Sequence, residues 1–309
     1  MINAAIVYSL VLVAAFGLAY WAFRARGDRS ALVGLYLLFG LPGALLTVAG
    51  VVYLLGGSDL GRVMLPVGLG MALPLVRPVR VAIGRVTPID PTSPVDMTGL
   101  CLLLPAVAAL LVAGVVDPAV PDAGEVPAVR SIDLLLQVVL EVGLAYAAVG
   151  WPVARGLGAA TARLGIRLPS WRTLGAGVGF VVLAFAANLV LAVVTTAFDP
   201  DAFDDVNAVT EELTAGVQNP VGAALLGVSA GAGEEAIFRG AMQPRFGIPL
   251  TSVAFALVHA PQYGFSPVIV GLLVVSVLLG IERNRFGTTA AMLTHALYNF
   301  TAVMAAAAQ

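Results

Sequence analysis

The stretch GAGEEAIFRG, residues 231–240, places two carboxylates and one guanidinium inside a strongly apolar segment. Glu235 and Arg239 are four residues apart, so on an α-helix they share one face and can form an ion pair. Glu234 lies five residues from Arg239, roughly 140° away around an α-helix, and lacks such a partner. A carboxylate without a counter-ion in an apolar site is suited to general base or acid catalysis. The same charges could instead form a structural network that fixes helix packing.

Two histidines, His259 and His295, are the only ones in the chain, and each lies in an apolar segment. Histidine exchanges protons near neutral pH more readily than other side chains. His295 and Asn299 are four residues apart and project from one helical face as two hydrogen-bond donors. Such a pair could stabilise an oxyanion, or it could hydrogen-bond to neighbouring helices. Two further polar residues in apolar segments, Glu141 and Asn188, are expected to pack or to line a cavity.

The elements that must carry these residues are membrane helices. The 309-residue chain is 60% hydrophobic and 11% charged, with a mean hydropathy of +0.97, so most of it must face lipid. Apolar windows of roughly 20 residues, the length that spans a bilayer, recur throughout. They predict an all-α, polytopic transmembrane helix bundle of about ten helices, with the active site within the C-terminal helices. The windows are 3–23, 31–55, 63–76, 97–116, 132–154, 174–198, 221–243, 248–262, 266–281 and 288–306.

The charges between the windows predict the orientation. Every basic residue is arginine. The arginines concentrate in four connections, 24–29, 77–85, 155–172 and 282–285. Cytoplasmic connections carry such an excess of positive charge, whereas the connections at 117–125 and 199–212 are acidic. We therefore expect an integral, multi-pass protein of the plasma membrane, with a retained first span, both termini outside and the arginine-rich side in the cytoplasm.

Depth links the polar residues. Glu234, His259 and His295 each lie about eight to ten residues from the arginine-rich end of their windows, or ~10–15 Å at ~1.5 Å per residue. They should therefore share one layer near the cytoplasmic side. We expect them to line a cavity that opens to the cytoplasm and to lipid.

Composition also excludes some functions. The formal net charge of −2 and the scattered arginines provide no basic cluster for nucleic acid. Cys101 is the only cysteine, so an intrachain disulfide or a cysteine-based metal site is impossible. Polar groups within the membrane windows begin after residue 130. We therefore predict accessory transmembrane helices in residues 1–130 and the core that carries the chemistry in residues 131–309.

Three motifs resemble those of a known family. EEAIFR (234–239), FALVH (255–259) and HALYN (295–299) match the patterns EExxxR, FxxxH and HxxxN. These are the signatures of the CAAX prenyl protease and bacteriocin-processing (CPBP, ABI) family of glutamate intramembrane endopeptidases, the type II CAAX proteases. All three motifs are intact and in order within residues 220–305. The resemblance implies an endopeptidase that hydrolyses membrane-associated substrates, of which prenylated CAAX tails are the best known.

The resemblance also implies catalytic roles. Glu234, helped by His259, would activate the attacking water and return a proton to the leaving amine. His295 and Asn299 would form the oxyanion hole for the tetrahedral intermediate.

The remaining motif residues, Glu235 and Arg239, would hold the site together, which agrees with their helical spacing. No cofactor is implied, so the protease would be metal-independent. The expected partners are membrane lipid and a peptide or lipidated protein, without nucleic acid.

Two alternatives stay open. Glu234, His259 and His295 could bind zinc with an open coordination position, although the chain has no HExxH motif. The polar layer could also belong to a non-catalytic scaffold or to a transport path. Transporters more often show repeated halves with matching broken helices, and none is evident here.

Overall fold

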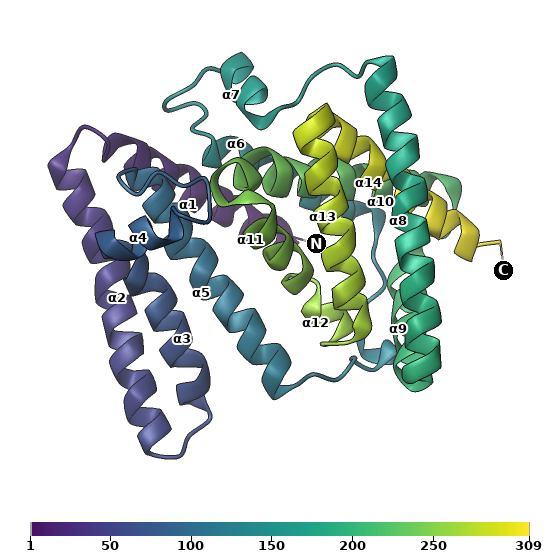
Figure 1. The fold of residues 1–309 in the computed structure, drawn as a ribbon, viewed down its shortest axis with the longest axis horizontal. Coiled ribbons are helices and arrows are strands. Elements are labelled where there is room, and N and C mark those ends of the chain that lie inside the picture. The colour runs from purple at the N-terminus through teal and green to yellow at the C-terminus, as the bar shows by residue number, and fades with distance from the viewer. Residues whose placement is uncertain (1, 309) are drawn as a thin grey trace. The chain divides into compact units, whose positions relative to one another are not determined.

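The computed structural model describes residues 2–308, with side chains from residue 4 onward (Figure 1). Within this range the chain is 82% helical and contains no strand, which confirms the all-α prediction. Seven of the described helices are long and apolar enough to cross a membrane, or eight if one bent pair counts as a single span. The predicted count of about ten is therefore approximate.

The chain forms two compact units. The larger unit comprises Met1–Phe16, Ala119–Pro244 and Ile248–Gln309, and the smaller comprises Gly17–Pro118 and Arg245–Gly247. The division of the chain at residue 130 into accessory and catalytic parts remains a prediction.

The smaller unit contains the end of α1 and the four helices that follow. Its core includes Leu35, Phe39, Met97 and Cys101. Between Leu75 and Arg77 the helix direction changes by 95°, so the window predicted at 63–76 is the first member of a bent pair rather than one straight span. The helices are α1 (Ile2–Arg24), α2 (Arg29–Leu55), α3 (Leu60–Ala72), the 3-10 turn η1 (Leu73–Leu75), α4 (Arg77–Ile83) and α5 (Pro94–Val116).

The larger unit carries all three motifs. Its first elements are the 3-10 turn η2 (Ala123–Glu125), α6 (Ser131–Ala148), α7 (Leu157–Leu164), α8 (Trp171–Phe198), α9 (Pro200–Thr214) and the 3-10 turn η3 (Ala215–Val217). The C-terminal elements are α10 (Pro220–Val228), η4 (Ser229–Glu234), η5 (Ala236–Met242), α11 (Gln243–Leu257), α12 (Ala260–Tyr263), α13 (Pro267–Phe286) and α14 (Thr288–Ala306).

This unit has two chemically different ends. We call residues 149–172 and 282–287 the arginine-rich end, and residues 119–130 and 199–219 the acidic end. In Figure 1, α7 lies at one end, α9 and α12 lie at the other, and α8 and α13 run between them. Helices α8 and α13 therefore each connect the arginine-rich end to the acidic end.

The segment from Pro220 to Leu257 is, by length and hydropathy, one candidate membrane span of 38 residues, but the helix breaks within it. Gly247 has φ 75° and ψ 172°, a conformation that glycine adopts without a steric penalty. The break separates the predicted windows 221–243 and 248–262, so the two stretches take different directions.

The EEAIFR motif lies on widened helical turns. Both η4 and η5 are π-helical, a rare form that often marks functional sites. These turns differ from the α-helical turns predicted for the motif from the spacing of its charged residues. Because a π-helix has more residues per turn, Glu234 is rotated less far from Arg239 than the α-helical estimate of roughly 140°.

Close contact with α14 fixes this π-helical segment. A Cβ on Gly231 would lie 2.5 Å from the Met292 carbonyl oxygen and 2.9 Å from the Ala296 Cβ. We predict that Gly231→Ala forces the two helices apart and lowers the free energy of unfolding by about 1–3 kcal/mol. Thermal unfolding in detergent would measure this loss.

Gly175→Ala is the matched control, because nothing lies within 4 Å of a Cβ at that exposed position of α8. Its stability should be unchanged or slightly raised, since alanine favours helix over glycine. Equal effects of the two substitutions would contradict a close helix contact at Gly231.

Candidate active site

Glu234 and His259 face one another across a short gap. The distance from His259 Nε2 to Glu234 Oε2 is 4.0 Å, too long for a direct hydrogen bond. The His259 Nδ1 atom lies 2.8 Å from the Phe255 carbonyl oxygen, to which it can only donate. That bond places the proton of the neutral ring on Nδ1 and leaves Nε2 as an acceptor directed at the carboxylate.

Glu235 is the centre of a buried ion-pair chain. Arg239 Nε lies 3.1 Å from Glu235 Oε2, and both side chains are almost fully buried. This contact confirms the pair predicted from the spacing. The other carboxylate oxygen, Oε1, lies 2.8 Å from His295 Nδ1. Glu235 therefore connects the arginine to the histidine of the third motif, which sequence spacing did not indicate.

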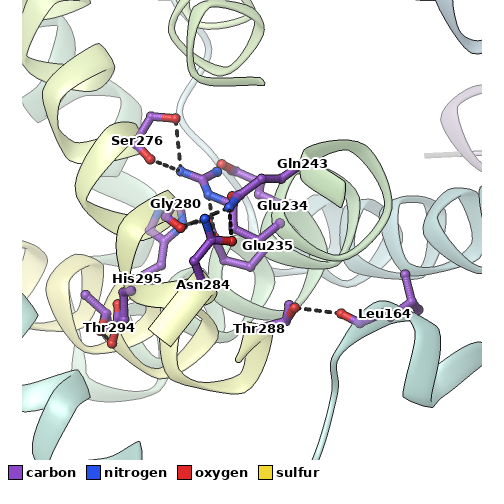
Figure 2. Close-up of polar contacts among 12 residues, drawn as sticks. Leu164, Glu234, Glu235, Gln243, Ser276, Gly280, Asn284, Thr288, Thr294 and His295 are labelled. Atoms are coloured by element: carbon purple, nitrogen blue, oxygen red, sulfur yellow. Dashed lines mark hydrogen bonds and ion pairs between the residues drawn. The ribbon is translucent and has the colours of Figure 1, made fainter. Parts of the chain in front are cut away.

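Residues outside the motifs complete the surroundings of Arg239. Arg239 Nη2 donates to the Ser276 carbonyl oxygen at 3.1 Å and contacts its hydroxyl at 3.0 Å. Glu282, fully buried on the same helix α13, accepts a 2.8 Å hydrogen bond from Thr294. Figure 2 shows these polar contacts beside Glu235 and His295. Glu282 was not among the predicted site residues, because it stands among the arginines of IERNR in a stretch predicted to be a connection.

Glu141 and Asn188 also lie close to the motif residues. A Cβ on Gly233 would lie 2.1 Å from Glu141 Oε2, so α6 brings this carboxylate against the π-helical segment. Its other oxygen accepts a 3.0 Å hydrogen bond from Gln137. Asn188 donates to the Tyr298 hydroxyl. Asn188 also lines the cavity described next, which agrees with the expectation that it packs or lines a cavity.

One cavity of about 460 Å³ contains the predicted catalytic side chains. Glu234, His259, His295 and Asn299 all line it. Most of the other lining residues are apolar or uncharged, and they come from α6, α8, α9 and α13 as well as from the motif segments. Helices distant in sequence thus place the four side chains in one cavity.

The direction of this cavity differs from our expectation. We predicted an opening on the arginine-rich side, but the lining extends to Val129, to α9 and to Tyr263 at the opposite end. None of the described lining residues belongs to 149–172 or 282–287. The cavity therefore extends from the catalytic layer toward the acidic end.

Dense packing at the arginine-rich end explains the difference. Thr288 donates a 2.6 Å hydrogen bond to the Leu164 carbonyl oxygen, and Gln243 donates to Gly280 and Asn284 at 2.9 Å (Figure 2). An apolar cluster fills the space beside these bonds. Its buried members are Ala145, Val149, Ala160, Leu164, Ala236 and Ala241.

The zinc alternative can be compared with this geometry. Within residues 2–308 no group of three or more His, Cys, Asp and Glu side chains is arranged to hold a metal ion. Glu234, His259 and His295 thus line one cavity without forming such a set. The His295 Nδ1 atom is instead directed at Glu235.

Comparison with protein families identifies the segment that carries this site. Residues 216–301 match the family described as type II CAAX prenyl endopeptidase Rce1-like. The chain carries an Rce1-like domain. Comparison with curated proteins and with solved structures found no match.

The Rce1-like domain includes the three motifs and the polar network around Arg239. It confirms the family predicted from the motifs. This domain supports a protease of the CAAX endopeptidase kind. The apolar helices and this family together indicate a multi-pass integral membrane protein.

Proposed function

We propose that Glu234, assisted by His259, activates a water molecule that attacks a peptide bond. The observation that carries this proposal is the 4.0 Å gap between Glu234 Oε2 and His259 Nε2 within the cavity. Both atoms are acceptors when the ring carries its proton on Nδ1, so one water can donate a hydrogen to each. Glu234 Oε2 is buried and makes no hydrogen bond to any described residue.

The proton balance closes with Glu234 alone. The carboxylate takes a proton from water while the water oxygen bonds to the carbonyl carbon. When the carbon–nitrogen bond breaks, the carboxylic acid returns that proton to the leaving amine. No covalent intermediate with the enzyme is needed.

The negative charge on the carbonyl oxygen requires donors, and we assign them to His295 and Asn299. Both line the cavity from α14, one helical turn apart. Because His295 Nδ1 bonds to Glu235 Oε1, the histidine and glutamate must together hold two protons for Nε2 to donate to the oxyanion. The ionised Glu235 would favour the doubly protonated ring, and Arg239 would keep Glu235 in place.

The substrate follows from the family and the cavity. We propose that the protein lies in the plasma membrane and that its substrate is a membrane-associated peptide. Prenylated CAAX tails are one candidate. The apolar lining excludes water and strengthens the electrostatic interactions that act on the transition state.

We predict that the purified protein cleaves a peptide with apolar residues around the scissile bond, and a matched prenylated and unprenylated pair tests the substrate class. If the lipid is recognised, the prenylated peptide should have the larger kcat/KM. Equal cleavage of both would remove the CAAX assignment and leave the peptidase assignment intact. The comparison uses the wild type and Glu234→Gln, so that contaminating proteases are subtracted.

Direct glutamate catalysis also predicts resistance to chelators. Activity should persist after treatment with EDTA or phenanthroline, because the carboxylate rather than a metal activates the water. Activity that is lost with the chelator and restored by zinc would favour the alternative in which Glu234, His259 and His295 bind the metal.

A further inference from the structure

Helix α6 packs against the π-helical segment that carries Glu234. The buried hydroxyl of Ser229 in η4 donates a 3.0 Å hydrogen bond to the Leu134 carbonyl oxygen. About two turns further along α6, the Glu141 carboxylate occupies the space that a Cβ on Gly233 would need, directly before Glu234 in the chain. One face of α6 therefore contacts the segment on both sides of a turn that ends at the catalytic carboxylate.

Gln137 lies on this same face of α6, between the two contacts, and it lines the catalytic cavity. Its amide nitrogen Nε2 donates a 3.0 Å hydrogen bond to Glu141 Oε1. A carboxyl oxygen accepts this bond when the acid is ionised, and also when the acid carries its proton on Oε2. Glu141 thus engages the amide nitrogen, and the carbonyl oxygen Oε1 is the acceptor that Gln137 offers to the cavity.

A peptide in this cavity needs such an acceptor. A backbone N–H that enters the cavity loses its hydrogen bonds to water, and a buried N–H without a partner costs free energy. The four groups assigned to the chemistry act on the water and on the carbonyl oxygen of the scissile bond. An acceptor for the substrate N–H groups must therefore come from other lining residues, most of which are apolar or uncharged.

Three other amide side chains outside the motifs line the cavity, namely Asn188, Asn207 and Gln262. They belong to α8, α9 and α12, whereas Gln137 belongs to the helix that contacts the residue before Glu234. The N–H groups within reach of Gln137 are therefore those of the residues next to the scissile bond.

We propose that Gln137 is a substrate-binding residue whose side-chain carbonyl oxygen accepts a hydrogen bond from a backbone N–H next to the scissile bond. Glu141 is a positioning residue that acts through Gln137, because it holds the amide nitrogen and thereby directs the oxygen. That the ligand is a peptide rests on the proposed peptidase function. Both residues lie outside the segment 216–301 that matches the family.

Binding to an inactive protein tests this contact without any need for cleavage. The dissociation constant of a fluorescent peptide with apolar residues around the scissile bond is measured by anisotropy in the Glu234→Gln background. Adding Gln137→Met should raise this constant by about five- to fiftyfold, because methionine has a similar volume but leaves the substrate N–H without an acceptor. Gln218→Met is the matched control, since Gln218 is not among the described lining residues, and it should leave the constant unchanged.

Backbone N-methylation of the peptide identifies the N–H group that Gln137 binds. The peptide is methylated at one residue at a time on each side of the scissile bond. At one position the methyl group should weaken binding about as much as Gln137→Met does, and it should cost nothing further in the Gln137→Met protein. If every methylation has the same effect with and without Gln137→Met, the contact is overturned, because a purely structural role does not depend on one substrate N–H.

Glu141→Gln tests the positioning role. The new amide can donate to Gln137 Oε1 as well as accept from Nε2, so the orientation of the Gln137 amide is no longer fixed. The dissociation constant should rise by less than it does for Gln137→Met, and the double variant should bind like Gln137→Met alone. Additive losses would contradict the action of Glu141 through Gln137.

Cleavage by the protein with Glu234 intact separates this contact from the proposed chemistry. Gln137→Met should lower kcat/KM by about the factor found for binding. If the wild type cleaves no peptide but Gln137→Met still weakens binding, the peptidase function fails and the contact stands. If the wild type cleaves and neither Gln137→Met nor N-methylation changes kcat/KM, the contact fails and the peptidase function stands.

Discussion

Glu234→Gln should lower the rate of peptide cleavage by about 10²–10⁴-fold, the contribution typical of general acid–base catalysis. Glutamine has nearly the same shape, but its amide cannot take a proton from water. The neighbouring carboxylate cannot substitute for it, because Glu235 is engaged by Arg239 and His295. Single-turnover cleavage of a fluorogenic peptide by the purified variant would measure the loss.

The stability of this variant matters for the interpretation. Glu234 makes no hydrogen bond through its Oε2 atom, so the amide should leave the melting temperature in detergent nearly unchanged. Glu212→Gln, which removes an exposed carboxylate on the outer surface of α9, serves as the matched control and should retain wild-type activity. If Glu234→Gln cleaves a good substrate at the wild-type rate, Glu234 is not the base.

Arg239→Met should lower the free energy of unfolding by about 3–5 kcal/mol, because it removes the guanidinium and leaves the buried carboxylate of Glu235 with His295 as its remaining partner. Both side chains are almost completely inaccessible to solvent, so water cannot compensate for the lost charge. Methionine keeps much of the arginine volume, and a packing defect would contribute little to the loss. Thermal or denaturant-induced unfolding in detergent would measure it.

Two further variants separate charge from packing. The double variant Glu235→Gln with Arg239→Met removes both charges and should recover part of the lost stability. Arg130→Gln breaks a pair of similar geometry with Asp133, in which both side chains are at least one-third exposed, and should not change stability measurably. If Arg239→Met unfolds like the wild type, the buried ion pair does not hold this site together.

Local spacing predicted some contacts of the site without a structure. Glu235 and Arg239 belong to one helical turn, so their separation in sequence largely determines their separation in space. The apolar composition likewise required helices for most of the chain, because backbone groups in lipid must bond within their own segment. These features depend on neighbours in sequence, and the structure agrees with both.

Other contacts depend on how helices from different parts of the chain pack. The 4.0 Å approach of His259 to Glu234 crosses from the turn between α11 and α12 to η4, and the bond from His295 to Glu235 spans 60 residues. Matching depth predicted that these side chains share a layer, but depth cannot specify which atoms meet. The role of Glu282 in this layer had no local signal, since an acid beside arginines is common in connections.

The sequence by itself determined an all-helical membrane protein, the family of its C-terminal part and the residues of its three motifs. Only the tertiary structure decided that the cavity beside the catalytic residues extends to α9 and includes no lining residue from the arginine-rich end. The physical reason is that the helix period determines which side chains share a face, whereas the free space beside that face depends on every helix packed against it. Gln243, Thr288 and the small residues near α7 fill that space at one end, and at the other end the cavity extends to the amphipathic helix α9.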